Sequence, residues 1–438
     1  MDFLNLSSLE QNTIHEDDHN YNIEARSRLD SPVCPQCGSA QAVGFGRKRQ
    51  LFMDAPVRGK RVGIWVVRRR LRCRACARTF MESLPDMDLR RQATKRLVRF
   101  IEHESLRRTF SSLGEDTGCD EKTIRNIFRD YVRRLERTMQ FETPKWLGID
   151  EIHLLKKPRC VLTNVGQQTV VDLLANRNKV TVIKWLEALP EREQVRYVAM
   201  DMWTPYRGAV QTVLPHAQVV VDKFHIVRMA NQCLEGVRKS LRKSLEPKLR
   251  RGLMHDRFVL LKRRRDLTDK EILMLSGWCA NFPELSAAYE AKEAFFGIWE
   301  MDNRHAAEQA YALWHARLPE ALHAHFKPIL TAVGNWREEL FNYFDHPITN
   351  AYTESLNNLI RVTNRMGRGY SFEVLRAKML FTRGNQAIEK PKFPKQQPPT
   401  EGVVFKYMDP LSGSECHREV NYGARISTLA ALMEDGQL

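Results

Sequence analysis

Three short apolar runs follow one another near the middle of the chain: WLGIDEIHLL (146–155), RCVLTNVG (159–166) and TVVDLLAN (169–176). Polar turns separate them, and apolar runs of this length that are rich in Val, Ile and Leu are typical of β-strands. The next segment, VTVIKWLEALP (180–190), has the apolar spacing of an amphipathic helix. The sequence therefore predicts three consecutive strands followed by a helix.

The same kind of alternation continues over the following residues. A strand VRYVAMD (195–201) precedes a helix YRGAVQTVLP (206–215), and a strand AQVVVD (217–222) precedes a long helix that starts with FHIVRMANQCLEGVRKSL (224–241). The resulting order, β-β-β-α-β-α-β-α, is that of a ribonuclease H-like sheet. Residues 246–345 have helical spacing throughout, which we interpret as an all-α insertion whose tryptophans lie in its core.

The charge balance points to an anionic partner. The 438 residues include 69 Lys and Arg against 53 Asp and Glu, a formal net charge of +16. Nucleic acid is the first partner to expect, ahead of an acidic membrane surface. No run of about 18 apolar residues is present, and residues 1–30 are polar and acidic, unlike a signal peptide. We therefore expect a cytoplasmic protein that does not bind membranes.

Four of the nine cysteines form two C-x-x-C pairs, Cys34 with Cys37 and Cys73 with Cys76. Two chelating pairs supply the four thiolates of a tetrahedral zinc site, and four protein ligands leave no position open, so the zinc would be structural. The segment between the pairs is longer than in common zinc ribbons, which leaves a redox dithiol or unrelated cysteines as alternatives. The other five cysteines are scattered, which argues against a disulfide framework.

A helix-turn-helix pattern follows in SSLGEDTGCDEKTIRNIFRDYVRR (111–134). Gly118 lies in the turn, and Asp120 would cap a second, basic helix. The residues expected to face a DNA major groove or its phosphates are Lys122, Arg125, Asn126 and Arg129. The alternative is a basic amphipathic helix that is merely solvated.

Two acids each close an apolar run: Asp150 ends WLGID and Asp201 ends VAMD. A carboxylate at the edge of a buried strand is costly unless it is solvated, hydrogen-bonded or metal-bound, so two of them in one sheet favour a metal site. The alternative is that each acid caps the turn or helix that follows it.

A third acid, Glu354, lies in TNAYTESLNNLIR (349–361) at the start of a predicted helix. It shares one helix face with Asn357, Asn358 and Arg361, so the acid could point toward the sheet while its neighbours contact DNA. The alternative is an ordinary helix start with a favourably placed acid. Together the three acids suit two Mg²⁺ or Mn²⁺ ions, which are what phosphodiester cleavage and transfer require.

At these residues the sequence resembles bacterial insertion-sequence transposases of the ISL-three (ISL3) family, which use an Asp-Asp-Glu triad. The resemblance covers about residues 31–385 and rests on both cysteine pairs, the helix-turn-helix, and four segments in this order: LGIDEIHLLK, VAMDMWTPYRGAV, VVVDKFHIVR and TNAYTESLNNLIRVTNRMGRGY. It implies a ribonuclease H-like catalytic domain, interrupted by an all-α insertion, in which Asp150, Asp201 and Glu354 coordinate two catalytic ions.

The resemblance also implies a role at the catalytic site for Asp222 and His225. Asp222 closes its own apolar strand, so it competes with Asp201 as the second metal ligand. His225 has the alternative of a helix-start histidine that bonds to Asp222. Phosphate contacts are expected from Arg361, Arg365 and Arg368, in addition to DNA contacts from Asn357 and Asn358.

The predicted architecture is a multidomain α+β and α/β protein. Its expected parts are a flexible leader (1–30), a zinc ribbon (31–88), a helix-turn-helix module (89–143), a ribonuclease H-like catalytic domain in two parts (144–245 and 346–390), an all-α insertion (246–345), and a basic connector with a C-terminal tail (391–438). The expected activity is transposition: binding of terminal inverted repeats, strand cleavage, and transfer to target DNA, by a dimer or larger assembly in the bacterial nucleoid. The alternatives are a non-catalytic DNA-binding regulator and a metal-dependent nuclease without strand transfer.

Overall fold

The computed structural model describes residues 5–28, 33–139, 141–347 and 351–382, and the short strands at 405–408 and 415–418. The chain divides into two compact units, Met1–Gln386 and Ala387–Leu438. In the second unit, β13 (Phe405–Met408) pairs antiparallel with β14 (Glu415–Arg418). The rest of the predicted connector and tail lies outside the described residues.

A seven-stranded sheet forms the amino-terminal part of the first unit, in the order β1-β2-β4-β3-β7-β6, with β5 paired to β4. Its strands are β1 (Leu9–Glu16), β2 (Asn20–Ser27), β3 (Ala42–Val57), β4 (Lys60–Cys73), β5 (Thr79–Met81), β6 (Met87–Asp88) and β7 (Ala93–Thr94). The prediction of a flexible leader is wrong for residues 9–27. Tyr21, Ile23 and Ala25 alternate into the core, and β2 runs parallel to β4, so this segment buries an apolar face that its polar neighbours conceal in the sequence.

Three helices follow this sheet: α1 (Lys95–Glu104), α2 (Phe110–Thr117) and α3 (Glu121–Thr138). The predicted helix-turn-helix pattern is confirmed. Gly118 ends α2 with a φ of 68°, a left-handed conformation that favours glycine, and a Cβ there would lie 2.7 Å from Met53 Cε. The Asp120 side chain caps α3 by accepting a 2.8 Å hydrogen bond from the Lys122 N–H.

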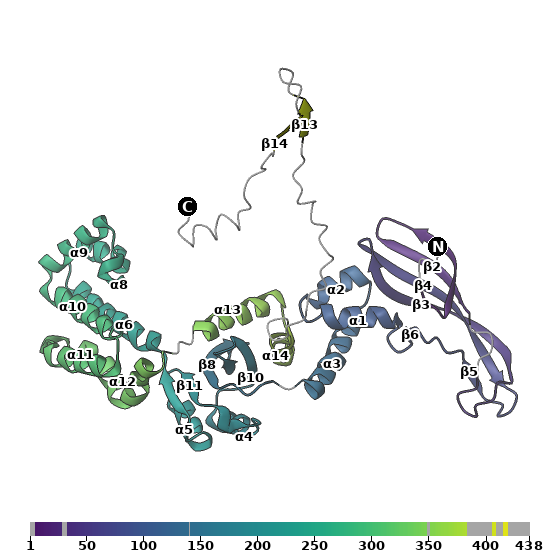
Figure 1. Ribbon diagram of the computed structural model, residues 1–438, viewed down its shortest axis with the longest axis horizontal. Helices are drawn as coiled ribbons and strands as arrows, with labels where there is room; N and C mark the ends of the chain where they lie inside the picture. Colours follow the sequence, from purple (N-terminus) through teal and green to yellow (C-terminus); the bar gives the residue numbers. More distant parts are fainter. Residues whose placement is uncertain are drawn as a thin grey trace. The chain divides into compact units, whose positions relative to one another are not determined.

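The central sheet has the order β10-β9-β8-β11-β12, and β11 runs parallel to both of its neighbours. Its elements in chain order are β8 (Trp146–Leu154), β9 (Lys157–Asn164), β10 (Thr169–Leu174), α4 (Lys179–Glu187), η1 (Arg192–Gln194), β11 (Tyr197–Met200), α5 (Thr204–Val213), β12 (Gln218–Val221) and α6 (Lys223–Lys243). The predicted order β-β-β-α-β-α-β-α is confirmed. Helices α4 and α5 cover one side of this sheet, and α13 (Ala351–Met366) and α14 (Phe372–Phe381) lie on the other (Figure 1).

The helix-turn-helix shares a hydrophobic core with the central sheet. One cluster of buried side chains contains residues from α2 and α3, from β8 and β9, and from α13 and α14, among them Phe110, Ile124, Ile152, Val161, Leu356 and Leu375. The buried Lys378 of α14 strengthens this contact, since its Nζ donates to the carbonyl oxygens of Ser105 and Arg108 at 2.5 and 2.9 Å. The helix-turn-helix therefore packs directly on the domain that contains the acids.

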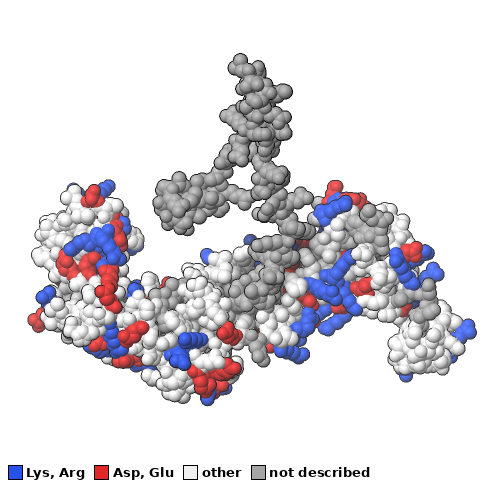
Figure 2. Space-filling view, in the orientation of Figure 1, with Lys and Arg blue, Asp and Glu red and all other residues white. Residues whose placement is uncertain are grey.

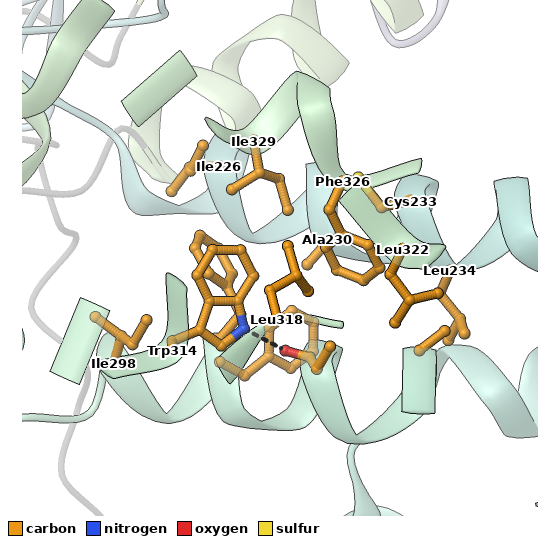
Figure 3. Close-up of a cluster of buried hydrophobic side chains, with 14 of the residues drawn as sticks. Ile226, Ala230, Cys233, Leu234, Ile298, Trp314, Leu318, Leu322, Phe326 and Ile329 are labelled. Carbon is orange, nitrogen blue, oxygen red and sulfur yellow. Dashed lines mark hydrogen bonds between the residues drawn. The ribbon is translucent and has the colours of Figure 1, made fainter. Parts of the chain in front are cut away.

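Residues 247–345 are helical, as predicted for the insertion, and form α7 (Pro247–His255), α8 (Arg257–Leu261), η2 (Arg264–Asp266), α9 (Asp269–Asn281), α10 (Pro283–Ile298), α11 (Arg304–Arg317) and α12 (Glu320–Asp345). They pack with α6 around one apolar core, in which Trp314 lies among Leu318, Phe326 and Ile329 (Figure 3). The Trp314 indole N–H donates to the Ala291 carbonyl at 2.8 Å. In the described ranges, no helix is both long enough and apolar enough to cross a membrane.

Candidate active site

Asp150 lies in β8, and Asp201 directly follows the neighbouring parallel strand β11. The register pairs Ile149 of β8 with Met200 of β11, so the residues that follow, Asp150 and Asp201, are side by side. Asp150 lies inside β8, which continues to Leu154, whereas β11 ends just before Asp201. The first acid is therefore held within a strand, and the second lies where the chain leaves the sheet.

The Asp150 carboxylate is buried, with an exposed fraction of 6%, and both of its oxygens accept hydrogen bonds. Oδ1 accepts from the Glu151 N–H at 2.6 Å, and Oδ2 accepts from the Asn357 side-chain amide at 2.6 Å. Burial, followed by repulsion from Asp201, raises the pKa of Asp150 to about 7, and Glu354 adds to the repulsion. The carboxylates of Asp201 and Glu354 are thus close enough to Asp150 to disfavour its ionised form, although the ligand atoms of the three acids do not all lie within 4.8 Å of one another.

The predicted DNA contact of Asn357 is wrong. Its side chain is 4% exposed and faces Asp150 rather than solvent, because α13 lies against β8. A helical face can be read from the sequence, but which part of that face meets the sheet depends on how the helix packs.

Glu354 lies in the first turn of α13 and is exposed. The preceding residue, Thr353, is buried, and its hydroxyl lies 2.9 Å from that of Thr163 on β9. This contact fixes the start of α13 to the sheet and so places Glu354 within electrostatic reach of Asp150. Hard carboxylate oxygens, as in Asp150, Asp201 and Glu354, are the donors that Mg²⁺ or Mn²⁺ prefers.

The His225 side chain bonds to Asp201, while its backbone N–H donates to the Asp222 carbonyl oxygen at 3.1 Å. The imidazole Nε2 lies 2.6 Å from Asp201 Oδ1. Burial favours the neutral imidazole, but the bond to Asp201 and the nearby carboxylates outweigh it and raise the pKa of His225. His225 therefore holds Asp201 in a fixed orientation.

Asp222, the rival of Asp201, occupies the N-cap of α6. Its side chain is 4% exposed and accepts a 2.9 Å hydrogen bond from the Phe224 N–H. Aspartate is among the best N-cap residues, so this bond gives Asp222 a structural role. The geometry favours Asp201 as the acid nearer to Asp150.

The four cysteines of the two C-x-x-C pairs come together. Cys34 Sγ lies 3.7 Å from Cys76 Sγ, and Cys37 Sγ lies 3.6 Å from Cys73 Sγ. Sulfurs bound to one tetrahedral zinc at about 2.3 Å would be roughly 3.8 Å apart, so these distances fit zinc. In the described part of the chain, they are the one set of three or more His, Cys, Asp or Glu side chains whose ligand atoms all lie within 4.8 Å of one another.

Backbone amides support the cysteine site. The N–H of Gln36 points at the Cys34 sulfur and that of Cys76 at the Cys73 sulfur, and these bonds lower the pKa of both thiols, that of Cys73 to about 6. The two cysteine pairs are far apart in the sequence because the β3–β4 hairpin lies between them. At the open end of this hairpin, Ala42 of β3 lies opposite Cys73 of β4. The hairpin thus explains the unusual spacing.

The remaining residues predicted to bind DNA are exposed. Lys122, Arg125, Asn126 and Arg129 lie along α3, and Asn358, Arg361, Arg365 and Arg368 lie on α13 and the turn after it. Figure 2 shows Lys and Arg side chains gathered over the helix-turn-helix, whereas acidic and basic side chains are mixed over the helical insertion. The exposed side chains of α3 and α13 are therefore available to an anionic partner.

Comparison with known proteins places these features in a family. The ISL3 family model, described as "Transposase", matches residues 147–379, more than half of the chain. The chain belongs to the ISL3 transposase family. Two further models match next to it: the zinc finger of the transposases IS204/IS1001/IS1096/IS1165 at residues 30–76, and the helix-turn-helix domain of transposase family ISL3 at residues 82–132. The predicted family is confirmed, and so are its zinc-ribbon and helix-turn-helix domains.

Curated ISL3-type relatives are distant in sequence. The transposase for insertion sequence element IS1001 of Bordetella parapertussis is 23% identical over 346 residues, which cover 77% of this chain and 85% of that protein. The transposase for insertion sequence element IS1557 of Mycobacterium tuberculosis, in two strains, is 23% identical over 274 residues, which cover 56% of this chain and 61% of that protein. DNA-binding modules followed by a transposase domain are thus the organisation of this ISL3 family member.

The sequence did not reveal one cavity of this ISL3 family member. A pocket of about 320 Å³ lies beside Asp201 and His225, and Trp203, Arg228 and Gln232 contribute to its wall. The signal available in the sequence was the spacing of His225, Arg228 and Gln232, which places them on one face of α6.

Proposed function

We propose that this protein is a metal-dependent DNA transposase that binds the terminal inverted repeats of its insertion sequence, cleaves the DNA strands and joins them to target DNA. One observation carries the proposal: Asp201 follows β11 directly beside Asp150 of the parallel strand β8, and the helix that carries Glu354 packs against the same sheet. The strand order and the helix order support a ribonuclease H-like catalytic domain formed by residues 144–245 and 346–390.

In this proposal Asp150, Asp201 and Glu354 would hold two Mg²⁺ or Mn²⁺ ions. Such ions would supply Lewis-acid activation of the attacking oxygen and stabilisation of the leaving oxygen at phosphorus. Asn357 keeps the Asp150 carboxylate oriented by donating to Oδ2, and His225 does the same for Asp201 through Nε2. In the cleavage step water attacks phosphorus and the 3′-oxygen of the element strand leaves as a 3′-hydroxyl. In the joining step this hydroxyl attacks a target phosphodiester, and the 3′-oxygen of the target strand leaves.

The amino-terminal modules would select the DNA. We propose that Cys34, Cys37, Cys73 and Cys76 bind a structural Zn²⁺ that fixes the base of the β3–β4 hairpin. Lys122, Arg125, Asn126 and Arg129 of α3 would contact the double-stranded end, and Asn358, Arg361, Arg365 and Arg368 would contact phosphates close to the acids. Because two ends must be joined, we propose a dimer or larger assembly on DNA, in the nucleoid of a bacterial cytoplasm.

The test is strand cleavage of an end-containing duplex with Mg²⁺, measured beside DNA binding. Asp150→Ala, Asp201→Ala and Glu354→Ala are each expected to abolish cleavage while binding persists, and Glu187→Ala, which removes an exposed acid of α4, serves as the control. An active Asp150→Ala protein would refute the triad. Free ends without joined products would identify a nuclease, and binding without any cleavage would identify a DNA-binding regulator.

A further inference from the structure

Basic residues are concentrated in α6 and in the first helices of the insertion. Residues 223–262, which include α6, α7 and α8, contain 11 Lys and Arg against three Asp and Glu, a net charge of +8. Residues 263–345, the rest of the insertion, contain nine Lys and Arg against 13 Asp and Glu, a net charge of −4. The two signs are mixed on the face drawn in Figure 2, but they separate along the chain.

The cations of the two parts also differ in their partners. In the acidic part, Arg263, Arg264 and Arg304 form ion pairs with glutamates. In residues 223–262, all of which the structure describes, seven cationic side chains have no hydrogen bond or ion pair, and we call them the α6–α7 basic surface: Arg228, Lys239, Arg242, Lys243, Lys248, Arg250 and Arg251. Arg242 is half-buried and the other six are exposed. Unpaired charges of one sign repel one another, and a polyanion relieves this repulsion.

The α6–α7 basic surface begins one helical turn from the acids. His225, which bonds to Asp201, precedes Arg228 by three residues on α6. Arg228, Lys239 and Lys243 are separated by 11 and four residues, which places them on one face of the helix. At 1.5 Å per residue, this face extends for about 22 Å away from the acids.

Helix α7 is held against α6 by a buried cation. Arg238 is 3% exposed, and its guanidinium donates to the Leu253 carbonyl of α7 at 3.2 Å while forming an ion pair with Glu235 of α6. Since α7 starts four residues after α6 ends, its three unpaired cations lie close to the end of the α6 face. The two helices therefore present their free charges as one rigid surface.

The acids lie between this surface and the helix-turn-helix. In the central sheet, β10 is at one edge and β12 at the other, with β8 and β11 between them. The helix-turn-helix shares its core with β10 and with α14, which packs on β10, whereas α6 follows β12 at the opposite edge. A duplex that runs from α3 past the acids therefore continues on the side of α6.

We propose that the α6–α7 basic surface binds the phosphates of the DNA that flanks the insertion sequence, beyond the cleavage point. The inference rests on the proposed function, because the acids define this point. Lys and Arg contacts to phosphates carry no sequence information, so the surface accepts any flank in which the insertion sequence lies. A face about 22 Å long spans roughly six base pairs of duplex.

The experiment is a set of equilibrium dissociation constants of the full-length protein, measured without divalent metal at about 50 to 200 mM salt. One duplex stops at the outer end of the inverted repeat, and two others continue into unrelated flanks of about ten base pairs. On both extended duplexes, Lys239→Gln/Lys243→Gln should lower the slope of log affinity against log salt by about two charges. Over this salt range the wild type should therefore lose roughly 10-fold more affinity for them than the variant does. On the short duplex the two proteins should behave alike.

A matched control is Lys270→Gln/Lys327→Gln. It removes the same charge from two exposed lysines in the acidic part of the insertion. This variant is expected to bind all three duplexes as the wild type does. A further measurement adds an unrelated duplex, as target DNA, to the complex with the short duplex, and here Lys239→Gln/Lys243→Gln should match the wild type.

Four results overturn the proposal: an equal change of slope on the short and extended duplexes, no change on any of them, a change that the control variant reproduces, or a loss confined to the added target duplex. Failure of the proposed function gives a different result. In that case the wild type shows the flank-dependent slope but does not cleave the extended duplexes when Mg²⁺ is added.

Discussion

The side-chain amide of Asn357 donates a 2.6 Å hydrogen bond to Oδ2 of Asp150, across 207 positions of the chain. The bond joins α13 to β8, so the helix that carries Glu354 and the strand that carries Asp150 form one site. The whole helical insertion lies between these two elements in the sequence. The site therefore depends on α13 packing against β8, from which the insertion separates it in the sequence.

Removal of this bond should slow strand cleavage. Asn357→Ala leaves Asp150 without its side-chain donor, and changes to groups that orient metal ligands typically cost about 10- to 100-fold in activity or metal affinity. The measurement is the single-turnover cleavage rate as a function of Mg²⁺ concentration. Leu359→Ala, on the exposed side of the same helix, is the control, since its side chain is 55% exposed. Unchanged cleavage by Asn357→Ala would show that Asp150 needs no orienting partner.

Substitution by asparagine should show whether Asp201 or Asp222 is the second metal ligand. Asparagine caps helices about as well as aspartate, so Asp222→Asn should keep α6 intact and retain most of the cleavage activity. Asp222→Ala should lower stability by about 1 kcal/mol through loss of the cap. Asp201→Asn should abolish Mg²⁺-dependent cleavage, because a neutral amide is a poor ligand for the ion. The opposite pattern would make Asp222 the second metal ligand.

The protein without added divalent metal should become less stable as the pH rises from 4 to 7. The pKa of Asp150 is raised from 3.8 to about 7, so the folded state binds more protons than the unfolded state in this interval, and its stability falls. Asp150→Asn lacks this ionisation and should be more stable than wild type at pH 8, by on the order of a few kcal/mol, with little difference at pH 4.

Calorimetry at both pH values measures this effect. Mg²⁺ should be left out of the buffer rather than chelated, because a chelator would also strip the cysteine site. Mg²⁺ added at pH 8 should raise the melting temperature of the wild type and not that of Asp150→Asn. Equal responses of the two proteins would argue against Asp150 as a ligand.

Loss of one cysteine ligand should release the structural zinc. Elemental analysis of the wild type is expected to give about one zinc ion per chain, and Cys37→Ser should lose it together with high-affinity end binding. Cys279→Ser, a change at a half-buried cysteine of the insertion, is the control. Wild-type protein purified without zinc would rule out the ribbon site.

The buried Lys378 should make stability depend on pH above neutrality. Burial lowers the pKa of Lys378 to about 8 from an ordinary value of 10.5. Between these values the unfolded state binds more protons, so the stability of the wild type rises with pH. Lys378→Met leaves the Ser105 and Arg108 carbonyls without their donor, so it should be less stable than the wild type. Because it also lacks this rise, the difference in the free energy of unfolding between the two proteins should grow by on the order of 2 kcal/mol from pH 7 to pH 10. Melting temperatures at the two pH values test this, with the exposed Lys184→Met as the control.

Most elements of the fold could be predicted because their signals are local. Strand-length apolar runs gave the order β-β-β-α-β-α-β-α, and Gly118 with Asp120 marked the turn of the helix-turn-helix. The cysteine pairs indicated a four-thiolate site for a similar reason, since each pair is a local turn. The strands within the predicted leader were missed because Tyr21, Ile23 and Ala25 alternate within a polar segment. Their burial depends on β4, a strand about 40 positions further along the chain.

The sequence alone determined which acids close apolar runs or begin helices, and hence Asp150, Asp201 and Glu354 as candidates, although β8 continues past Asp150 to Leu154. Only the tertiary structure decided their partners: Asn357 turns to Asp150 rather than to DNA, and His225 bonds to Asp201 while Asp222 caps a helix. It also decided that the helix-turn-helix shares its core with α14. Periodicity along the chain fixes which residues share a face, whereas the surface that buries this face is set by contacts between distant segments.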